Sequence, residues 1–214
     1  TSVTVPSDAD YIIVGVTTWS SGANFLSGGS LTLNGSSLSV IASADSNNSF
    51  DFSALFGLKS PSTGTQTLAW NWSGTGSASD HCFISVAYYK NVDQTTPIRD
   101  SGSEQGGSPA TVSTGSMTAQ SGDMAVAVLE AENSSVTWSG ATEVASDATH
   151  IFYAETSPSS NVTISAINVT YGAISGGILA AATSGSRTLA SSSTIGVAGT
   201  FTPGSSSYTI TSST

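Results

Sequence analysis

Short runs in which hydrophobic and polar residues alternate recur along the whole chain, separated by Gly, Ser, Asn and Pro. A period of two residues is the pattern of a half-buried β-strand, and no stretch shows the period of an amphipathic helix. Asn34-Gly35 carries the turn signal of a two-residue hairpin. In the first half the pattern predicts strands at Ser2–Val5, Tyr11–Trp19, Leu31–Leu33, Leu38–Ala44, Phe50–Leu58, Gln66–Ser73 and Cys82–Tyr89.

The stretch Asp80–Asp100 changes character halfway along. Cys82–Tyr89 is apolar on both faces, which favours a strand in the middle of a sheet over a strand at an edge. Turn-forming residues follow at once, among them Asp93 and Pro97. We therefore expect a central strand that leads into a connector.

The second half of the sequence repeats the order of features in the first. The Gly turn recurs in the hairpin and the Ser-Pro turn in the longer connection, which indicates an internal duplication. The alternative is that Ser/Thr-rich β sequences resemble each other through composition alone. The aligned pairs are Ser2–Val16 with Ser116–Val128, Thr32–Ala44 with Thr137–Ala148, Ser49–Ser73 with Thr149–Thr170, and Cys82–Lys90 with Ala173–Ala181.

Two related half-sheets that pack face to face would make a two-sheet β-sandwich of jelly-roll type, although two abutting sandwiches remain an alternative. We expect a first β repeat at 1–91, a connector at 92–115, a second repeat at 116–182 that packs on the first, and an extended Ser/Thr-rich tail at 183–214. The tail has two weak strand patterns, at Thr194–Val197 and Tyr208–Thr211. It could be an assembly arm that adds to a neighbour's sheet edge, extra strands of its own domain, or a linker.

Charge is scarce in this chain of 214 residues. Only 8% of residues are charged, the formal net charge is −10 and the pI is about 4.1. Four basic residues cannot neutralise a nucleic-acid backbone or bind an anionic membrane, so we expect neither partner. No leader sequence or long apolar run is recognisable, and the single cysteine, Cys82, is expected to be a small buried hydrophobe.

Carboxylates and two histidines are the candidates for catalysis or metal binding. Glu130 and Glu132 are two residues apart and would share a strand face, but Ala131 stands where laminarinase-like enzymes have an Asp in this motif. The alternative for both glutamates is a solvent-facing position near a strand end. His81 and His150 lack a third ligand at zinc spacing. We expect no cofactor, with calcium possible at Asp8 and Asp10 or at Asp93 and Asp100.

Aromatic residues are the candidates for ligand binding. Trp19, Trp70 and Trp138 could form a platform for sugars, whereas the alternation of Trp70 and Trp72 with Leu68 favours a place in the core equally well. Six Asn-x-Ser/Thr sequences could accept glycans if the source glycosylates its proteins. They begin at Asn34, Asn47, Asn71, Asn133, Asn161 and Asn168.

The segments VPSDADYIIVGVT, GGSLTLNGSSLSV, TGTQTLAWNWS and ISVAYYKNVDQTTPIRDS resemble jelly-roll or concanavalin-like β-sandwich modules of phage structural proteins and bacterial secreted surface proteins. The resemblance covers about Ser2 to Ala182 and carries no functional residue. It implies a location on a virion surface or outside the cell. We expect a non-catalytic structural protein, such as a capsid decoration, fibre or tail component or an extracellular filament subunit. Its partners would be copies of itself or other structural subunits. The alternatives are a module that binds surface glycans and, less favoured, a glycoside hydrolase.

Overall fold

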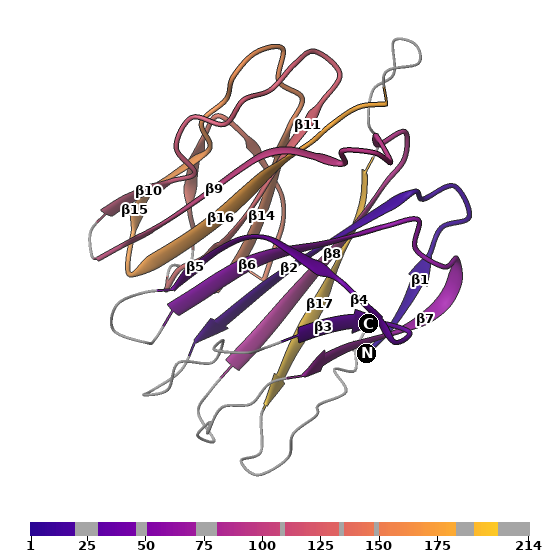
Figure 1. Cartoon of the computed structure of the whole chain (residues 1–214). Coiled ribbons are helices and arrows are strands. Elements are labelled where there is room, and N and C mark those ends of the chain that lie inside the picture. The colour runs from indigo at the N-terminus through magenta and orange to yellow at the C-terminus, as the bar shows by residue number, and fades with distance from the viewer. Residues whose placement is uncertain are drawn as a thin grey trace.

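The computed structural model describes residues 1–19, 30–45, 51–71, 81–107, 110–132, 135–147, 150–182 and 191–200. Within these ranges every regular element is a β-strand, and no helix has the length and apolarity needed to cross a membrane (Figure 1). The strands of the first half and the connector are β1 (Ser2–Val5), β2 (Tyr11–Trp19), β3 (Ser30–Leu33), β4 (Ser36–Ser37), β5 (Ser39–Asp45), β6 (Asp51–Lys59), β7 (Gly64–Asn71), β8 (His81–Tyr89) and β9 (Ile98–Gly106). Those of the second half and the tail are β10 (Ala110–Ser113), β11 (Met124–Glu130), β12 (Thr137–Ser139), β13 (Thr142–Ser146), β14 (Ile151–Thr156), β15 (Ser165–Val169), β16 (Gly172–Leu179) and β17 (Ser191–Thr200).

These strands form four antiparallel sheets in the described part of the chain. The first half contributes a small sheet, β1-β7-β3-β4, and the five-stranded sheet β17-β8-β2-β6-β5. The second half contributes the five-stranded sheet β13-β14-β11-β16-β9 and the small sheet β10-β15-β12. The all-β, sandwich-type fold predicted from the sequence is confirmed.

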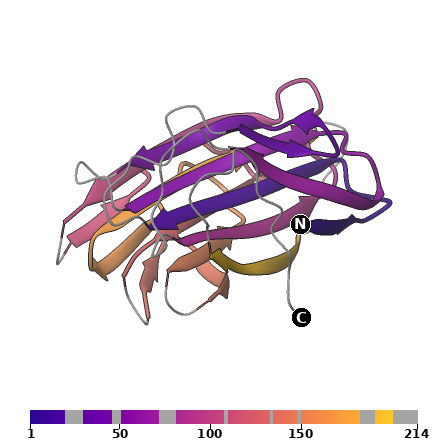
Figure 2. The same cartoon turned by 90° about the horizontal axis from the view of Figure 1, so that it is seen from below.

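Three layers of apolar side chains separate the four sheets, so each half is a sandwich in itself. The large sheets of the two halves pack back to back (Figure 2). In β2, for example, Ile12 and Val14 face the small sheet of their own half, while Tyr11 and Ile13 face the other half. Both faces of this strand are therefore buried, which explains its apolar run. Of the two arrangements left open by the sequence, two abutting sandwiches describe this layering.

The second half repeats the strand order of the first, in agreement with the predicted duplication. In each half the first long strand, β2 or β11, lies between its two partners, β6 and β8 or β14 and β16. Across the central interface β2 contacts β11, β6 contacts β16 and β8 contacts β14. Exchanging the two halves leaves these three contacts unchanged, as an approximate two-fold relation would require. The relation is not exact, because β5 contacts β16 and β6 contacts β11 more extensively than β13 contacts β8 and β14 contacts β2.

Each half supplies an edge strand to the sheet of the other. β9 follows β8 in the chain but pairs with β16 of the second half, and β17 follows β16 but pairs with β8 of the first. The segment expected to be only a connector therefore contains β9 and β10. The predicted tail strand Thr194–Val197 lies inside β17, whereas Tyr208–Thr211 lies outside the described residues.

The two edge strands β5 and β13 have the same irregularity. In β5 the pairing with β6 shifts between Val40 and Ala42, and in β13 the pairing with β14 shifts between Glu143 and Ala145. The shared bulge fixes the correspondence of residues between the halves. Val40 corresponds to Glu143, and Gly57, which pairs with Ser39, corresponds to Glu155, which pairs with Thr142.

Candidate functional site

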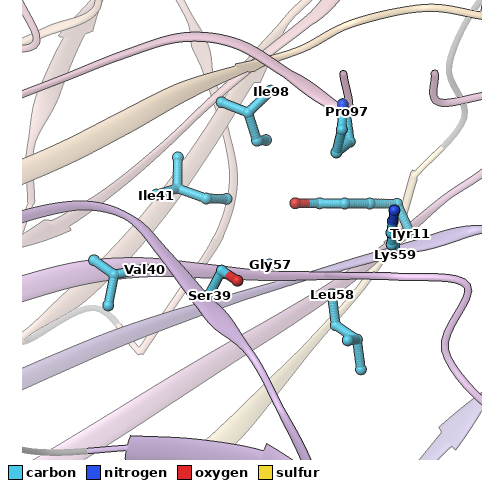
Figure 3. Close-up of a pocket in the computed structure, with 9 residues that line it drawn as sticks. All are labelled: Tyr11, Ser39, Val40, Ile41, Gly57, Leu58, Lys59, Pro97 and Ile98. Atoms are coloured by element: carbon cyan, nitrogen blue, oxygen red, sulfur yellow. The ribbon is translucent and has the colours of Figure 1, made fainter. Parts of the chain in front are cut away.

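An apolar cleft lies beside the edge strand β5, at the junction with the beginning of β9 (Figure 3). It has a volume of about 440 Å³, which is within the usual range for binding pockets. Tyr11 and Lys59 supply its larger polar groups. The residues that line it are Tyr11, Ser39, Val40, Ile41, Gly57, Leu58, Lys59, Pro97 and Ile98.

The absence of a side chain at Gly57 makes room for Tyr11 in this cleft. A Cβ atom at position 57 would lie 2.2 Å from the Tyr11 hydroxyl oxygen, so the tyrosine can cross β6 only over a glycine. In Figure 3 the Tyr11 hydroxyl points toward the middle of the cleft, on the side of Ile41. Burial raises the pKa of Tyr11 to about 12, so the phenol is a neutral hydrogen-bond donor at physiological pH.

The corresponding place in the second half is filled by a polar cluster. Glu155, at the position of Gly57, accepts a short hydrogen bond from the Tyr89 hydroxyl, and the hydroxyl oxygens of Tyr89 and Tyr153 are 2.7 Å apart. Burial is the main reason that the pKa values of both tyrosines are raised well above 10, and the nearby Glu155 adds to it. The two halves therefore differ here, with a cleft in one and a filled site in the other.

The edge strands that border these two places also differ in charge. Val40 on β5 is 58% exposed, which is unusual for an aliphatic side chain on a strand edge. Its counterpart on β13 is Glu143, whose carboxylate accepts a hydrogen bond of 3.1 Å from the Trp138 indole nitrogen. A charge on an edge strand discourages pairing with another chain, so β13 is protected at this position and β5 is not.

The structure does not bring Glu130 and Glu132 together as a pair. Glu130 is the last residue of β11 and is fully buried against the other half, with its Oε1 3.7 Å from His150 Nδ1. The His150 ring stacks on Phe83, with 5.2 Å between the ring centroids. Glu132 follows the strand and is exposed. The prediction of a shared face, and that of a solvent-facing Glu130, are both wrong, because Glu130 continues the buried series of Val126 and Val128.

The aspartates proposed for calcium bind backbone N–H groups or a lysine. Asp10 accepts hydrogen bonds from the backbone N–H groups of Asn91 and Val92. Asp93 accepts hydrogen bonds from the backbone N–H groups of Thr95 and Thr96. Asp8 forms an exposed ion pair with Lys90, and Asp100 accepts from the N–H groups of Ser101 and Thr118. Within the described ranges no group of three or more His, Cys, Asp or Glu side chains could hold a metal ion.

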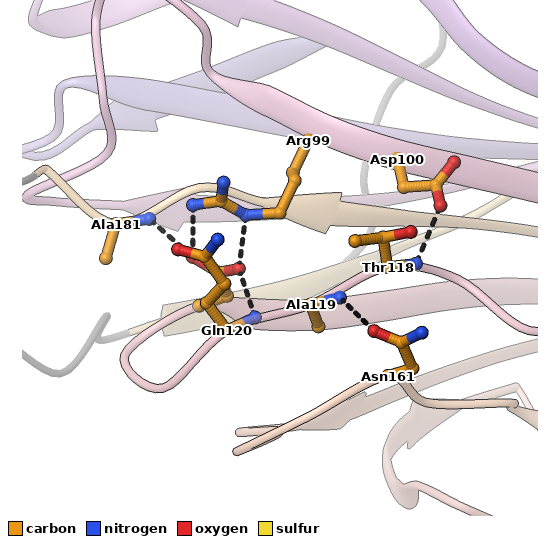
Figure 4. Close-up of polar contacts among 8 residues, drawn as sticks. Arg99, Asp100, Thr118, Ala119, Gln120, Asn161 and Ala181 are labelled. Carbon is orange, nitrogen blue, oxygen red and sulfur yellow. Dashed lines mark hydrogen bonds and ion pairs between the residues drawn. The ribbon is translucent and has the colours of Figure 1, made fainter.

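Asp123 is a buried acid of the second half and corresponds to Asp10 of the first. Its carboxylate is 1% exposed and receives two hydrogen bonds from Arg99, of 2.6 and 3.2 Å (Figure 4). The backbone N–H groups of Gln120 and Ala181 donate two more. Burial alone would raise the pKa of Asp123, but these four hydrogen bonds to the charged form outweigh it and lower the pKa.

Acid should therefore destabilise the fold through this carboxylate. Because the pKa of Asp123 is lower in the folded chain than the ordinary value of about 3.9, its contribution is complete above about pH 4 and is lost as the pH falls further. We expect the free energy of unfolding, measured by urea denaturation between pH 7 and 2.5, to fall below pH 4. In the Asp123→Asn protein the free energy of unfolding should fall less over the same pH range. An equal pH dependence in both proteins would contradict this role.

The described tryptophans do not form one platform. Trp70 is 1% exposed in the core of the first half, where it packs edge-on against Phe56. Trp138 is half-buried on β12, in the outermost sheet of the other half. Trp19 ends β2, but its side chain lies outside the description. Cys82 is buried and free, as expected, and burial raises its pKa to about 12.

Three of the six possible glycosylation sites can be assessed. Asn34, Asn161 and Asn168 are exposed, and two of them have positive φ angles, Asn34 in a turn and Asn168 at an irregularity of β15. The side chain of Asn71 is outside the description, and so are Asn47 and Asn133. The exposed three remain possible acceptors.

Sequence reasoning missed the cleft, although Gly57 in an otherwise bulky strand was a signal of close approach by another group. No protein-family model matches the chain, and no curated protein is similar to it.

Proposed function

We propose that this chain is a non-catalytic structural module of an external assembly, as a virion decoration, fibre or tail component or as an extracellular filament subunit. The observation that carries the proposal is that the buried and turn carboxylates bind the protein's own backbone. Asp10, Asp93, Asp100 and Asp123 all accept hydrogen bonds from the backbone. They lie at separate turns and strand ends and do not converge on a cleft, so they stabilise the frame of the fold.

The outermost sheets add support, because their exposed faces have hydroxyl groups in place of charges. On the first small sheet Ser2, Thr4, Thr65 and Thr67 are exposed, and on the other Thr111, Thr137 and Ser139 are exposed. Neutral faces let copies of a protein with net charge −10 approach each other with little local repulsion. Stability comes from three internal apolar layers, so the module can be rigid without disulfides.

Electron microscopy of material from the native source tests this proposal. We expect the protein to be part of a regular particle or filament, visible by negative stain and labelled by an antibody raised against the chain. A protein that stays strictly monomeric at high concentration and is attached to no particle would contradict it.

A module that binds surface glycans is the second candidate, and Trp138 is the observation that favours it. Its half-buried ring packs against the apolar layer of the second half, and its indole nitrogen donates a hydrogen bond to the exposed Glu143. A glycan array probed with the natural chain and with Trp138→Ala would separate the two functions. A signal that is lost in the variant while the fold is retained would favour glycan binding, and no signal on any glycan would exclude it for the glycans displayed.

A further inference from the structure

The edge strand β5 and its cleft together have the features of a site for an added β-strand. In this mode of recognition an extended peptide pairs with a free sheet edge, and a pocket beside the edge accepts one of its side chains. β5 is an outer strand of its five-stranded sheet, and three successive residues, Ser39, Val40 and Ile41, line the cleft. Pairing and side-chain insertion could therefore occur at the same place.

The corresponding edge of the second half shows which features are specific to β5. Where β5 has the exposed Val40, β13 has Glu143, and where β6 has Gly57, β14 has Glu155. Two acidic residues in one half thus correspond to an aliphatic residue and a glycine in the other. This difference leaves the β5 edge without a charge at the level of Val40 and next to an open cleft.

The charge of the chain restricts what can occupy this edge. A protein with a net charge of −10 repels acidic segments of its own kind, but the fourteen residues after Thr200, FTPGSSSYTITSST, contain no Asp, Glu, Lys or Arg. Their sequence alternates at Tyr208–Thr211, which predicts a strand with Tyr208 and Ile210 on one face. One of these side chains could enter the apolar cleft.

The position of Thr200 favours a second copy as the source of this segment. Thr200 pairs with His81 on the edge of the sheet opposite to β5, four strand spacings or about 19 Å away. Ser193 of β17 lies in the same row across the sheet as Ser39, which lines the cleft. Thr200 is seven residues further along β17, so it is displaced from this row by about 23 Å along the strand direction. The straight line is thus about 30 Å, whereas Tyr208 and Ile210, eight and ten residues from Thr200, reach at most about 29 and 36 Å even when the chain is fully extended. Layers cover both faces of the sheet, so the real route is longer.

We propose that the β5 edge and its cleft bind the C-terminal segment Phe201–Thr214 of a second copy of this chain as an added strand. The inference rests on the proposed assembly function and names the surface through which copies associate. Tyr208 or Ile210 of the incoming segment enters the cleft beside Val40, where the Tyr11 hydroxyl, which points into the cleft, is available as a donor.

Binding of a labelled peptide tests the surface separately from assembly. The probe is a fluorescent peptide of residues 201–214, and the receptor is the full chain with Tyr208→Ser and Ile210→Ser, so that its own segment does not compete. Fluorescence anisotropy should show saturable binding that Val40→Glu weakens at least about tenfold, because the edge then has the charge found on β13. Val144→Glu, at the exposed valine of the β13 edge, is the matched control and should leave binding unchanged.

The outcomes separate the inference from the function on which it rests. Absence of peptide binding, or binding that Val40→Glu does not weaken, overturns the inference and leaves the assembly function standing. If the peptide binds in a way that depends on Val40 but the native protein is attached to no assembly, the β5 edge is confirmed as the binding site and the proposed function is overturned. If Val40→Glu abolishes self-association in sedimentation experiments but Tyr208→Ser with Ile210→Ser does not, another part of the second copy occupies β5 and the inference is wrong.

Discussion

Replacing Trp70 with alanine should lower the free energy of unfolding by about 3–5 kcal/mol, as expected for a large aromatic side chain removed from a packed core. Trp70 is 1% exposed, and its ring packs edge-on against Phe56, with 5.5 Å between the centroids. The cavity left behind would lie between the small and the large sheet of the first half. Urea denaturation at pH 7, followed by circular dichroism, measures the change.

Trp138→Ala is the control for this prediction, because Trp138 is only half-buried on the outermost sheet of the other half. Its loss should cost no more than about 1.5 kcal/mol. A Trp70→Ala protein as stable as the natural chain would show that Trp70 is not a core residue and would reopen its role in a ligand platform.

Asp123→Ala should be about as damaging, with an expected loss of about 3–5 kcal/mol. The substitution leaves the Arg99 guanidinium without its carboxylate and removes the acceptor for the backbone N–H groups of Gln120 and Ala181. These groups tie the beginning of β9 and the end of β16 to the beginning of β11 (Figure 4). The midpoint and slope of urea denaturation, measured as for Trp70→Ala, give the change.

The exposed pair of Asp8 and Lys90 offers a matched control in the first half. Both side chains are about half exposed or more, at 64% and 46%, so Asp8→Ala should lower the free energy of unfolding much less than Asp123→Ala does. Equal losses in Asp8→Ala and Asp123→Ala would mean that burial does not strengthen the Arg99–Asp123 pair.

The hydrophobic pattern was sufficient to predict those strands whose side chains meet apolar layers. Tyr11–Trp19 and the stretch from Cys82 to Tyr89 are apolar on both faces, and both form strands with neighbours on each side. By contrast, β9 has the sequence IRDSGSEQG and almost no apolar pattern. It forms a strand because its backbone pairs with β16, a contact between distant parts of the chain that local sequence does not encode.

Side-chain chemistry was harder to place than strands, and Glu130 shows why. Its residue type indicates a surface position, whereas its place in the series Val126, Val128, Glu130 indicates the buried face, and the structure follows the series. Gly57 signals a close approach by another group, but only the structure shows that this group is Tyr11, and only the pairing of β5 and β13 shows that Glu155 takes the place of Gly57 in the second half. The sequence alignment of Ser49–Ser73 with Thr149–Thr170 contains both residues but does not fix their register.

The reciprocal placement of β9 and β17 has a consequence for the integrity of the molecule after cleavage. A protease that cut between Gly107 and Ala110 would leave an N-terminal fragment whose last strand is hydrogen-bonded into the other fragment, and a C-terminal fragment whose last strand is hydrogen-bonded into the first. Each fragment would be hydrogen-bonded into a sheet of the other. The cleaved protein should therefore elute from a size-exclusion column as one species, and its two fragments should separate only in denaturant. An external module with this topology would survive a backbone break that would release half of an ordinary two-domain chain.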